Sequence, residues 1–122
     1  MPVRIRAKYR YKGTVQLTDL NTETDIINLD VQDDDFILEG YIDLSQIASG
    51  DTVVLRLYVA VDGVNRKLMD RMTIYGPIDP PIVRIPAHTF AYDMQPRVTI
   101  TQTSGITRQF PYYFLLQLME VV

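Results

Sequence analysis

The sequence predicts an all-β fold: a single-domain antiparallel β-sandwich over residues 1–122, resembling a jelly roll, with eight or nine short strands and almost no helix. Three observations support this prediction. Apolar and polar residues alternate with a period of two along most of the chain, and turn-forming residues separate these stretches. A chain of 122 residues with 47 % hydrophobic content is also sufficient for one core.

The alternation is clearest in residues 52–63, where one face carries Val53, Leu55, Leu57, Val59 and Val61. We expect this face to be buried. Asp62-Gly63 then supplies a turn, and residues 66–75 return as the second strand of a hairpin. The other expected strands are residues 3–11, 14–19, 26–31, 36–43, 82–86, 97–103 and 109–121. The best helix signal is Ser45, which predicts one short turn ended by Gly50.

Charge is distributed unevenly along the chain. Residues 3–12 alternate basic with apolar residues, and we expect five cations to share one face: Arg4, Arg6, Lys8, Arg10 and Lys12. Residues 13–50 contain no Lys or Arg but nine acidic residues, which predict an opposing surface formed by Asp30, Asp33, Asp34, Asp35 and Glu39. Either residues 3–11 lie beside residues 36–43 in one subunit, or the basic face of one subunit contacts the acidic face of the next.

The last expected strand, residues 109–121, is apolar on both faces. One face carries Tyr112, Phe114, Leu116 and Leu118, and the other carries Tyr113, Leu115, Met119 and Val121. Such a strand is either central in a sheet with both faces covered, or its outer face contacts another subunit. We favour the second interpretation because a terminal strand is often found at a sheet edge.

Patterns for catalysis and metal binding are weak. The sequence has one histidine, His88, no cysteine, and three serines (Ser45, Ser49 and Ser104) outside any G-x-S-x-G elbow. We therefore predict no enzyme, no catalytic residues and no cofactor. Asp33, Asp34 and Asp35 form the best calcium candidate, but the EF-hand spacing is missing, and a solvated turn is the favoured interpretation.

Composition also restricts the partners. A row of cations on a strand could follow a phosphate backbone, but the acidic pI of 5.0 opposes a polyanion, so we expect no nucleic-acid partner. No stretch resembles a signal peptide or a membrane span, so we expect a soluble protein without membrane contact. Sugar-stacking rings are available from eight tyrosines: Tyr9, Tyr11, Tyr41, Tyr58, Tyr75, Tyr92, Tyr112 and Tyr113.

Two segments, GYIDLSQIASGDTVVLRLYVAVDG (residues 40–63) and VTITQTSGITRQFPYYF (residues 98–114), resemble small β-sandwich structural proteins of archaeal viruses and tailed-phage-like virions. The shared features are a strand ending in Ile-Asp-Leu-Ser, a turn closing on Gly-Asp, and a Q-T-S-G-I-T-R segment before a final aromatic strand. The resemblance implies a virion component of the capsid decoration, turret or spike type, which binds its own copies or other capsid proteins. It implies no catalytic residue.

We therefore predict a non-enzymatic structural protein of the virion that forms homo-oligomers. Its contacts would be the five cations, the acidic surface and the outer face of the terminal strand. The alternative is a sandwich that binds carbohydrate or another ligand, with calcium at Asp33, Asp34 and Asp35 as an optional component.

Overall fold

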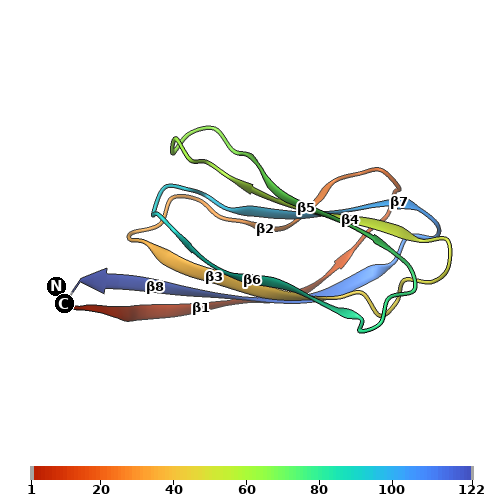
Figure 1. Cartoon of the computed structure of the whole chain (residues 1–122), viewed down its shortest axis with the longest axis horizontal. Helices are drawn as coiled ribbons and strands as arrows, with labels where there is room; N and C mark the ends of the chain where they lie inside the picture. The colour runs from red at the N-terminus through yellow and green to blue at the C-terminus, as the bar shows by residue number, and fades with distance from the viewer. Residues whose placement is uncertain (1, 122) are drawn as a thin grey trace.

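The computed structural model describes residues 2–121, which form two four-stranded antiparallel sheets and no helix (Figure 1). Nothing in this range is therefore a helix that could cross a membrane. The strands are β1 (Val3–Gln16), β2 (Thr24–Asn28), β3 (Phe36–Asp43), β4 (Thr52–Val59), β5 (Lys67–Tyr75), β6 (Ile82–Phe90), β7 (Arg97–Ser104) and β8 (Gln109–Val121).

The strand order confirms the predicted jelly-roll sandwich. Sheet A has the order β1-β8-β3-β6, and sheet B has the order β2-β7-β4-β5. The chain passes from one sheet to the other at every connection except the β4–β5 hairpin, which the sequence predicted from Asp62-Gly63. Each sheet therefore combines strands from both halves of the sequence, as in a pair of interlocked Greek keys.

The core fills the space between the two sheets. Its largest fully buried side chains include Phe36, Phe110 and Phe114. The predicted inner face of β4 is confirmed from Val53 to Val59. Val61 is instead 83 % exposed, because β4 ends at Val59 and Val61 already lies in the hairpin connection.

Two local predictions are wrong. Residues 3–11 and 14–19 were expected as separate strands, but β1 runs unbroken from Val3 to Gln16, because Gly13 pairs with Tyr112 and the ladder continues through it. Ser45 begins no helical turn. Its backbone N–H instead donates to the Asp43 Oδ1 atom at 2.8 Å, which closes a short non-helical turn after β3.

The position of β8 also differs from the expectation. β8 lies between β1 and β3, so it is a central strand and β1 is the edge. Residues 3–11 consequently do not lie beside residues 36–43. Phe114, Leu116 and Leu118 face the core between the two sheets and are buried there. Figure 1 shows β1 and β8 running together past the ends of the other strands, to the two chain termini.

Candidate functional site: the outer face of sheet A

A β-bulge at Arg6 divides the basic row between two faces. Ile5 lies opposite Met119, whereas Ala7 lies opposite Leu118, so β1 contains one extra residue here. Because directly paired residues share a face, the bulge reverses the alternation. Lys8, Arg10 and Lys12 lie on the outer face of sheet A, opposite Gln117, Leu115 and Tyr113. Arg4 lies on the other face, so the prediction of five cations on one face is wrong.

Arg4, before the bulge, and Arg6, within it, form ion pairs with carboxylates of the same chain. The Arg4 Nη2 atom lies 2.6 Å from the Glu120 Oε1 atom. The Arg6 Nη2 atom lies 3.3 Å from the Asp33 Oδ2 atom. Both pairs are solvent-exposed, so they contribute little to folding stability and are screened by salt.

The cations beyond the bulge are not neutralised in this way. Ion pairs within residues 2–121 involve Arg4, Arg6, Arg97 and Arg108, and none involves Lys8, Arg10 or Lys12. Lys12 instead places its Nζ atom 5.8 Å from the centroid of the Tyr113 ring, a cation–π contact. On the outer face of sheet A, β1 thus presents three exposed positive charges that no carboxylate of the described chain pairs with.

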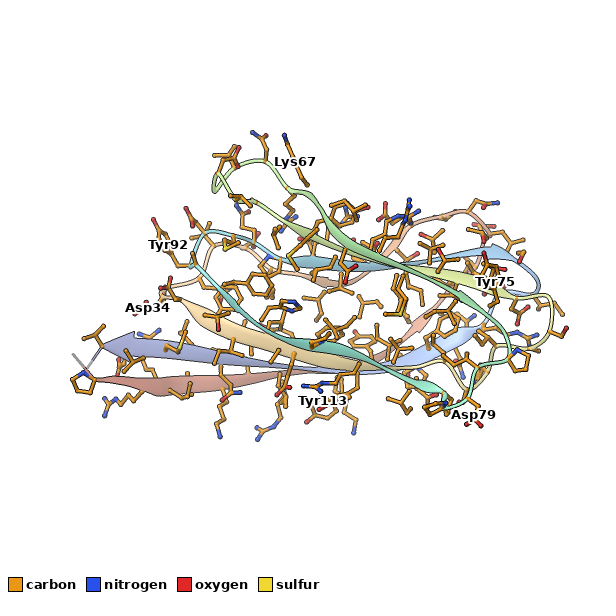
Figure 2. The ribbon with its side chains drawn as sticks, viewed as in Figure 1. Asp34, Lys67, Tyr75, Asp79, Tyr92 and Tyr113 are labelled. Atoms are coloured by element: carbon orange, nitrogen blue, oxygen red, sulfur yellow. The ribbon has the colours of Figure 1, made fainter. Side chains whose placement is uncertain are left out.

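The predicted acidic surface occupies two separate places. Asp30, Asp33, Asp34 and Asp35 lie in the β2–β3 loop, at the end of the sandwich from which β1 and β8 extend (Figure 2, Asp34). Glu39 lies on the outer face of sheet A, opposite Leu115. The acidic residues that are adjacent in sequence therefore form an acidic end and one isolated carboxylate among the cations.

The three candidate calcium ligands turn towards different partners. Asp33 pairs with Arg6, the Asp34 Oδ1 atom accepts from the Asp35 N–H at 2.8 Å, and the Asp35 Oδ1 atom accepts from the Tyr92 N–H at 3.0 Å. Within residues 2–121, no three His, Cys, Asp or Glu side chains gather in a way that could hold a metal ion. These carboxylates fix the loop against β1 and the β6–β7 connection.

The predicted apolar contact surface lies beside the cations. Tyr113, Leu115 and Met119 are half-buried and Val121 is 58 % exposed, all on the outer side of β8. No third layer within residues 2–121 covers this side of sheet A. On this open face, β1 therefore carries the cations and the adjacent strand β8 carries the apolar side chains.

The sequence reasoning missed a pairing of two tyrosines on this face. Tyr41 on β3 lies directly opposite Tyr113 on β8, and a depression of about 310 Å³ lies against them. The other tyrosines are more dispersed. Tyr58, for example, lies on sheet B and donates its hydroxyl to the Glu23 carboxylate at 2.5 Å. Period-two alternation predicts that both rings face outwards, but only the long-range register of β3 and β8 places them together.

Solved structures share this fold at low sequence identity. A pilus protein of Bacillus endospore appendages, from a family of disulfide-linked pili, aligns with a TM-score of 0.53 and 14 % identity over 91 % of this chain and 87 % of that chain. The VP2 subviral particle of infectious bursal disease virus gives a TM-score of 0.49 and 10 % identity over 95 % of this chain and 33 % of that chain.

The Gx strain of the same virus gives a TM-score of 0.47 and 10 % identity, over 98 % of this chain and 32 % of that chain. No protein-family model matches the sequence, and no curated protein matches it. The similarity to the pilus protein agrees with the fold that the strand order of this chain already establishes. Of the expected resemblance to structural proteins of archaeal viruses, it supports the β-fold alone.

Proposed function

We propose that this protein is a non-enzymatic structural subunit that self-associates through the edge of β1 and the outer face of sheet A, as a capsid decoration, turret or spike component of a virion. The observation that carries the proposal is found on β1, which combines a backbone edge and three cations that no strand and no carboxylate of the described residues pairs with. Other capsid proteins are the further partners that this role requires.

The backbone of β1 is available for strand addition. β1 is 14 residues long, pairs with β8 on one side, and has no neighbour among residues 2–121 on the other side. It contains no proline, and residues 3–10 are exposed apart from the half-buried Ala7. A long open edge of this kind is a template for a strand from another chain, because the free N–H and C=O groups gain partners.

Charge favours a contact with the acidic end of a second copy. Lys8 and Arg10 are exposed beside the β1 edge, and the acidic end offers the carboxylates of Asp30, Asp33 and Asp34. Because these surfaces differ, the contact is heterologous and propagates as a ring or a filament rather than closing as a two-fold dimer. The exposed Val3 and Val121 near the termini add apolar area to the same contact.

The similarity to a pilus subunit supports a role in assembly, with one difference in chemistry. The Bacillus appendages are described as disulfide-linked pili. This sequence contains no cysteine. An assembly of this chain is therefore held by backbone pairing, apolar contact and charge, and it responds to ionic strength.

The direct experiment measures mass in solution by light scattering coupled to size-exclusion chromatography, at about 0.1 M and about 1 M salt. Wild-type protein is expected to exceed the monomer mass at low salt and to dissociate at high salt. Lys8→Glu/Arg10→Glu is expected to be monomeric in both. The matched control is Lys67→Glu/Arg71→Glu on β5, which changes the same amount of charge on the other sheet. A monomer at every concentration and salt, or equal dissociation of the control, would overturn the proposal.

Hydrogen exchange separates strand addition from a contact made by side chains alone. In an edge strand, every second amide points away from the neighbouring strand and exchanges rapidly. Strand addition protects these outward amides of residues 3–12 when the assembly forms. If they continue to exchange at the monomer rate within the assembled particle, the β1 edge is not the contact.

A further inference from the structure

The depression described above does not include Lys8 or Arg10, the two cations tested in the self-association experiment. It lies on the outer face of sheet A, at the end away from the chain termini, and has a volume of about 310 Å³. Tyr113, which contributes to it, lies on the outer side of sheet A, away from the core (Figure 2). This size is at the lower limit of small-molecule sites, which points to a small ligand rather than a protein segment.

Two tyrosine rings form the aromatic part of the depression. Tyr41 and Tyr113 are direct cross-strand neighbours, and Tyr41 is 43 % exposed. No hydrogen bond within residues 2–121 uses either hydroxyl group. Exposed rings with free hydroxyls offer an apolar surface for stacking and a polar group at its margin. This pairing matches a ring-shaped ligand that has an apolar face and hydroxyl groups around it.

The charges around the rings are arranged as a cation, a carboxylate and a second cation. Lys12 lies opposite Tyr113 on β1, and Arg84 lies opposite Tyr41 on β6. Asp43 lines the depression two residues after Tyr41. Its Oδ1 atom accepts from the Ser45 N–H at 2.8 Å, while no hydrogen bond within residues 2–121 uses its Oδ2 atom. A ligand in the depression therefore meets one cation, Lys12, and one free acceptor for a hydroxyl group on Asp43.

We propose that this depression binds an acidic sugar, meaning a hydroxylated sugar ring that carries a carboxylate. The C–H face of the ring stacks on Tyr41 and Tyr113. The Lys12 ammonium pairs with the sugar carboxylate, and the free oxygen of Asp43 accepts from a sugar hydroxyl. A neutral sugar keeps the stacking and loses the ion pair, so it binds more weakly.

The test is a titration of the ¹⁵N-labelled full chain followed by amide NMR shifts, with trigalacturonate as the acidic probe and maltotriose as the neutral control of equal length. Trigalacturonate is expected to shift the amides of residues 12–14, 41–43, 112 and 113. Maltotriose is expected to bind about tenfold more weakly, the ratio expected for loss of one charge-assisted contact. The absence of shifts with trigalacturonate at millimolar concentration would overturn the proposal.

Variants locate the binding and test its charge dependence. Tyr41→Ala is expected to abolish the shifts, and its exposed side chain makes loss of folding a minor concern. Tyr75→Ala removes a tyrosine that is 71 % exposed on sheet B and is expected to leave the affinity unchanged. Lys12→Gln is expected to lower the affinity for trigalacturonate about tenfold and to leave the affinity for maltotriose unchanged. Binding of trigalacturonate that persists in Tyr41→Ala would overturn the site. An unchanged affinity for trigalacturonate in Lys12→Gln would overturn the preference for an acidic sugar.

The result is independent of the assembly proposal. Lys8→Glu/Arg10→Glu changes residues outside the depression, so this variant is expected to bind the sugar as a monomer. Amide shifts at Tyr41 and Tyr113 that follow protein concentration without any sugar would place a second copy over the depression. That outcome would overturn sugar binding and leave self-association standing.

Discussion

The ring of Phe114 on β8 lies over the backbone of Gly40 on β3 and occupies the space in which a Cβ atom would stand. The two residues are direct cross-strand partners at the centre of sheet A. Phe114 is fully buried. An aromatic ring that covers a glycine on the neighbouring strand replaces the missing side-chain contacts of that glycine and joins the two strands.

Gly40→Ala is therefore expected to lower the free energy of unfolding by about 1–3 kcal/mol, because the added methyl group overlaps a ring that has no space to move into. Urea denaturation measures the change. The matched control is Gly13→Ala, where the added methyl group meets the hydroxyl end of the Tyr112 side chain, which is free to shift. An equal loss of stability in the two variants would contradict this account of Gly40.

Asp51 is a buried carboxylate that joins two loops. Its side chain is 2 % exposed and accepts from the Ala48 N–H, the Ile106 N–H and the Arg108 guanidinium at 2.9, 3.1 and 2.9 Å. Asp51→Ala is expected to lower the free energy of unfolding by about 3 kcal/mol, because it leaves buried donors and a charge without a partner. Asp25→Ala, which breaks the more exposed pair with Arg97, is expected to cost less than about 1 kcal/mol in the same thermal or urea measurement.

The same carboxylate makes stability depend on pH. Burial by itself raises the pKa of Asp51, but the hydrogen bonds from Ala48 and Ile106 and the charge of Arg108 outweigh it, so the pKa lies below its ordinary value. The stabilisation is therefore fully present above the pKa of unfolded aspartate, about 3.9, and is lost as the pH falls through the lower folded value. The difference in unfolding free energy between wild type and Asp51→Asn is expected to shrink below about pH 4. A difference that stays constant down to pH 2 would contradict it.

Asp62 in the β4–β5 turn is expected to titrate far below an ordinary aspartate. The backbone N–H groups of Asn65 and Val64 donate to its Oδ1 atom at 2.7 and 2.9 Å, and these bonds lower the pKa of Asp62 to about 2. Carboxyl ¹³C shifts followed by NMR against pH measure this value directly. Asn65→Ala, which removes only the side-chain hydrogen bond at 3.0 Å, is expected to raise the pKa partway. A pKa of Asp62 near about 3.9, the value of an unperturbed aspartate, would contradict the turn geometry.

The ion pairs of Arg4 and Arg6 are expected to contribute little to stability. In the Arg6–Asp33 pair, the side chains are 40 % and 84 % exposed. A double-mutant cycle of Arg6→Ala and Asp33→Ala is expected to give a coupling of less than about 1 kcal/mol, decreasing with added salt. A larger coupling that survives 1 M salt would mean that the pair is desolvated.

Local sequence signals predicted most of the strands. The ranges of β3 and β8 agree with the expectation at both ends, because alternation and flanking turn residues are local. The expected strands 3–11 and 14–19 leave a break at residues 12 and 13, but Gly13 pairs with Tyr112 and β1 continues through it. The low β-propensity of a single glycine does not end a strand when the residues before and after it are already hydrogen-bonded to the neighbouring strand.

The site was harder to predict because it depends on contacts between distant residues. The bulge at Arg6 has no signature in the alternation of residues 3–12, although it decides which cations share a face. Likewise, alternation showed that residues 109–121 have two apolar faces but not whether the strand is central or at an edge. The facing positions of Tyr41 and Tyr113 follow from the β3–β8 register, which joins residues about 70 positions apart in the chain.

The insertion of β8 between β1 and β3 has a consequence during protein synthesis. Sheet A cannot close until residues 109–121 have left the ribosome, because the strand that pairs with both β1 and β3 is made after both of them. Until then, the nascent chain holds two unmatched edges and half of an uncovered apolar layer, which chaperones recognise. The capacity of sheet A to join other strands is therefore greatest before β8 pairs, and the pairing of β8 leaves only the outer edges of β1 and β6 open in this sheet of the described chain.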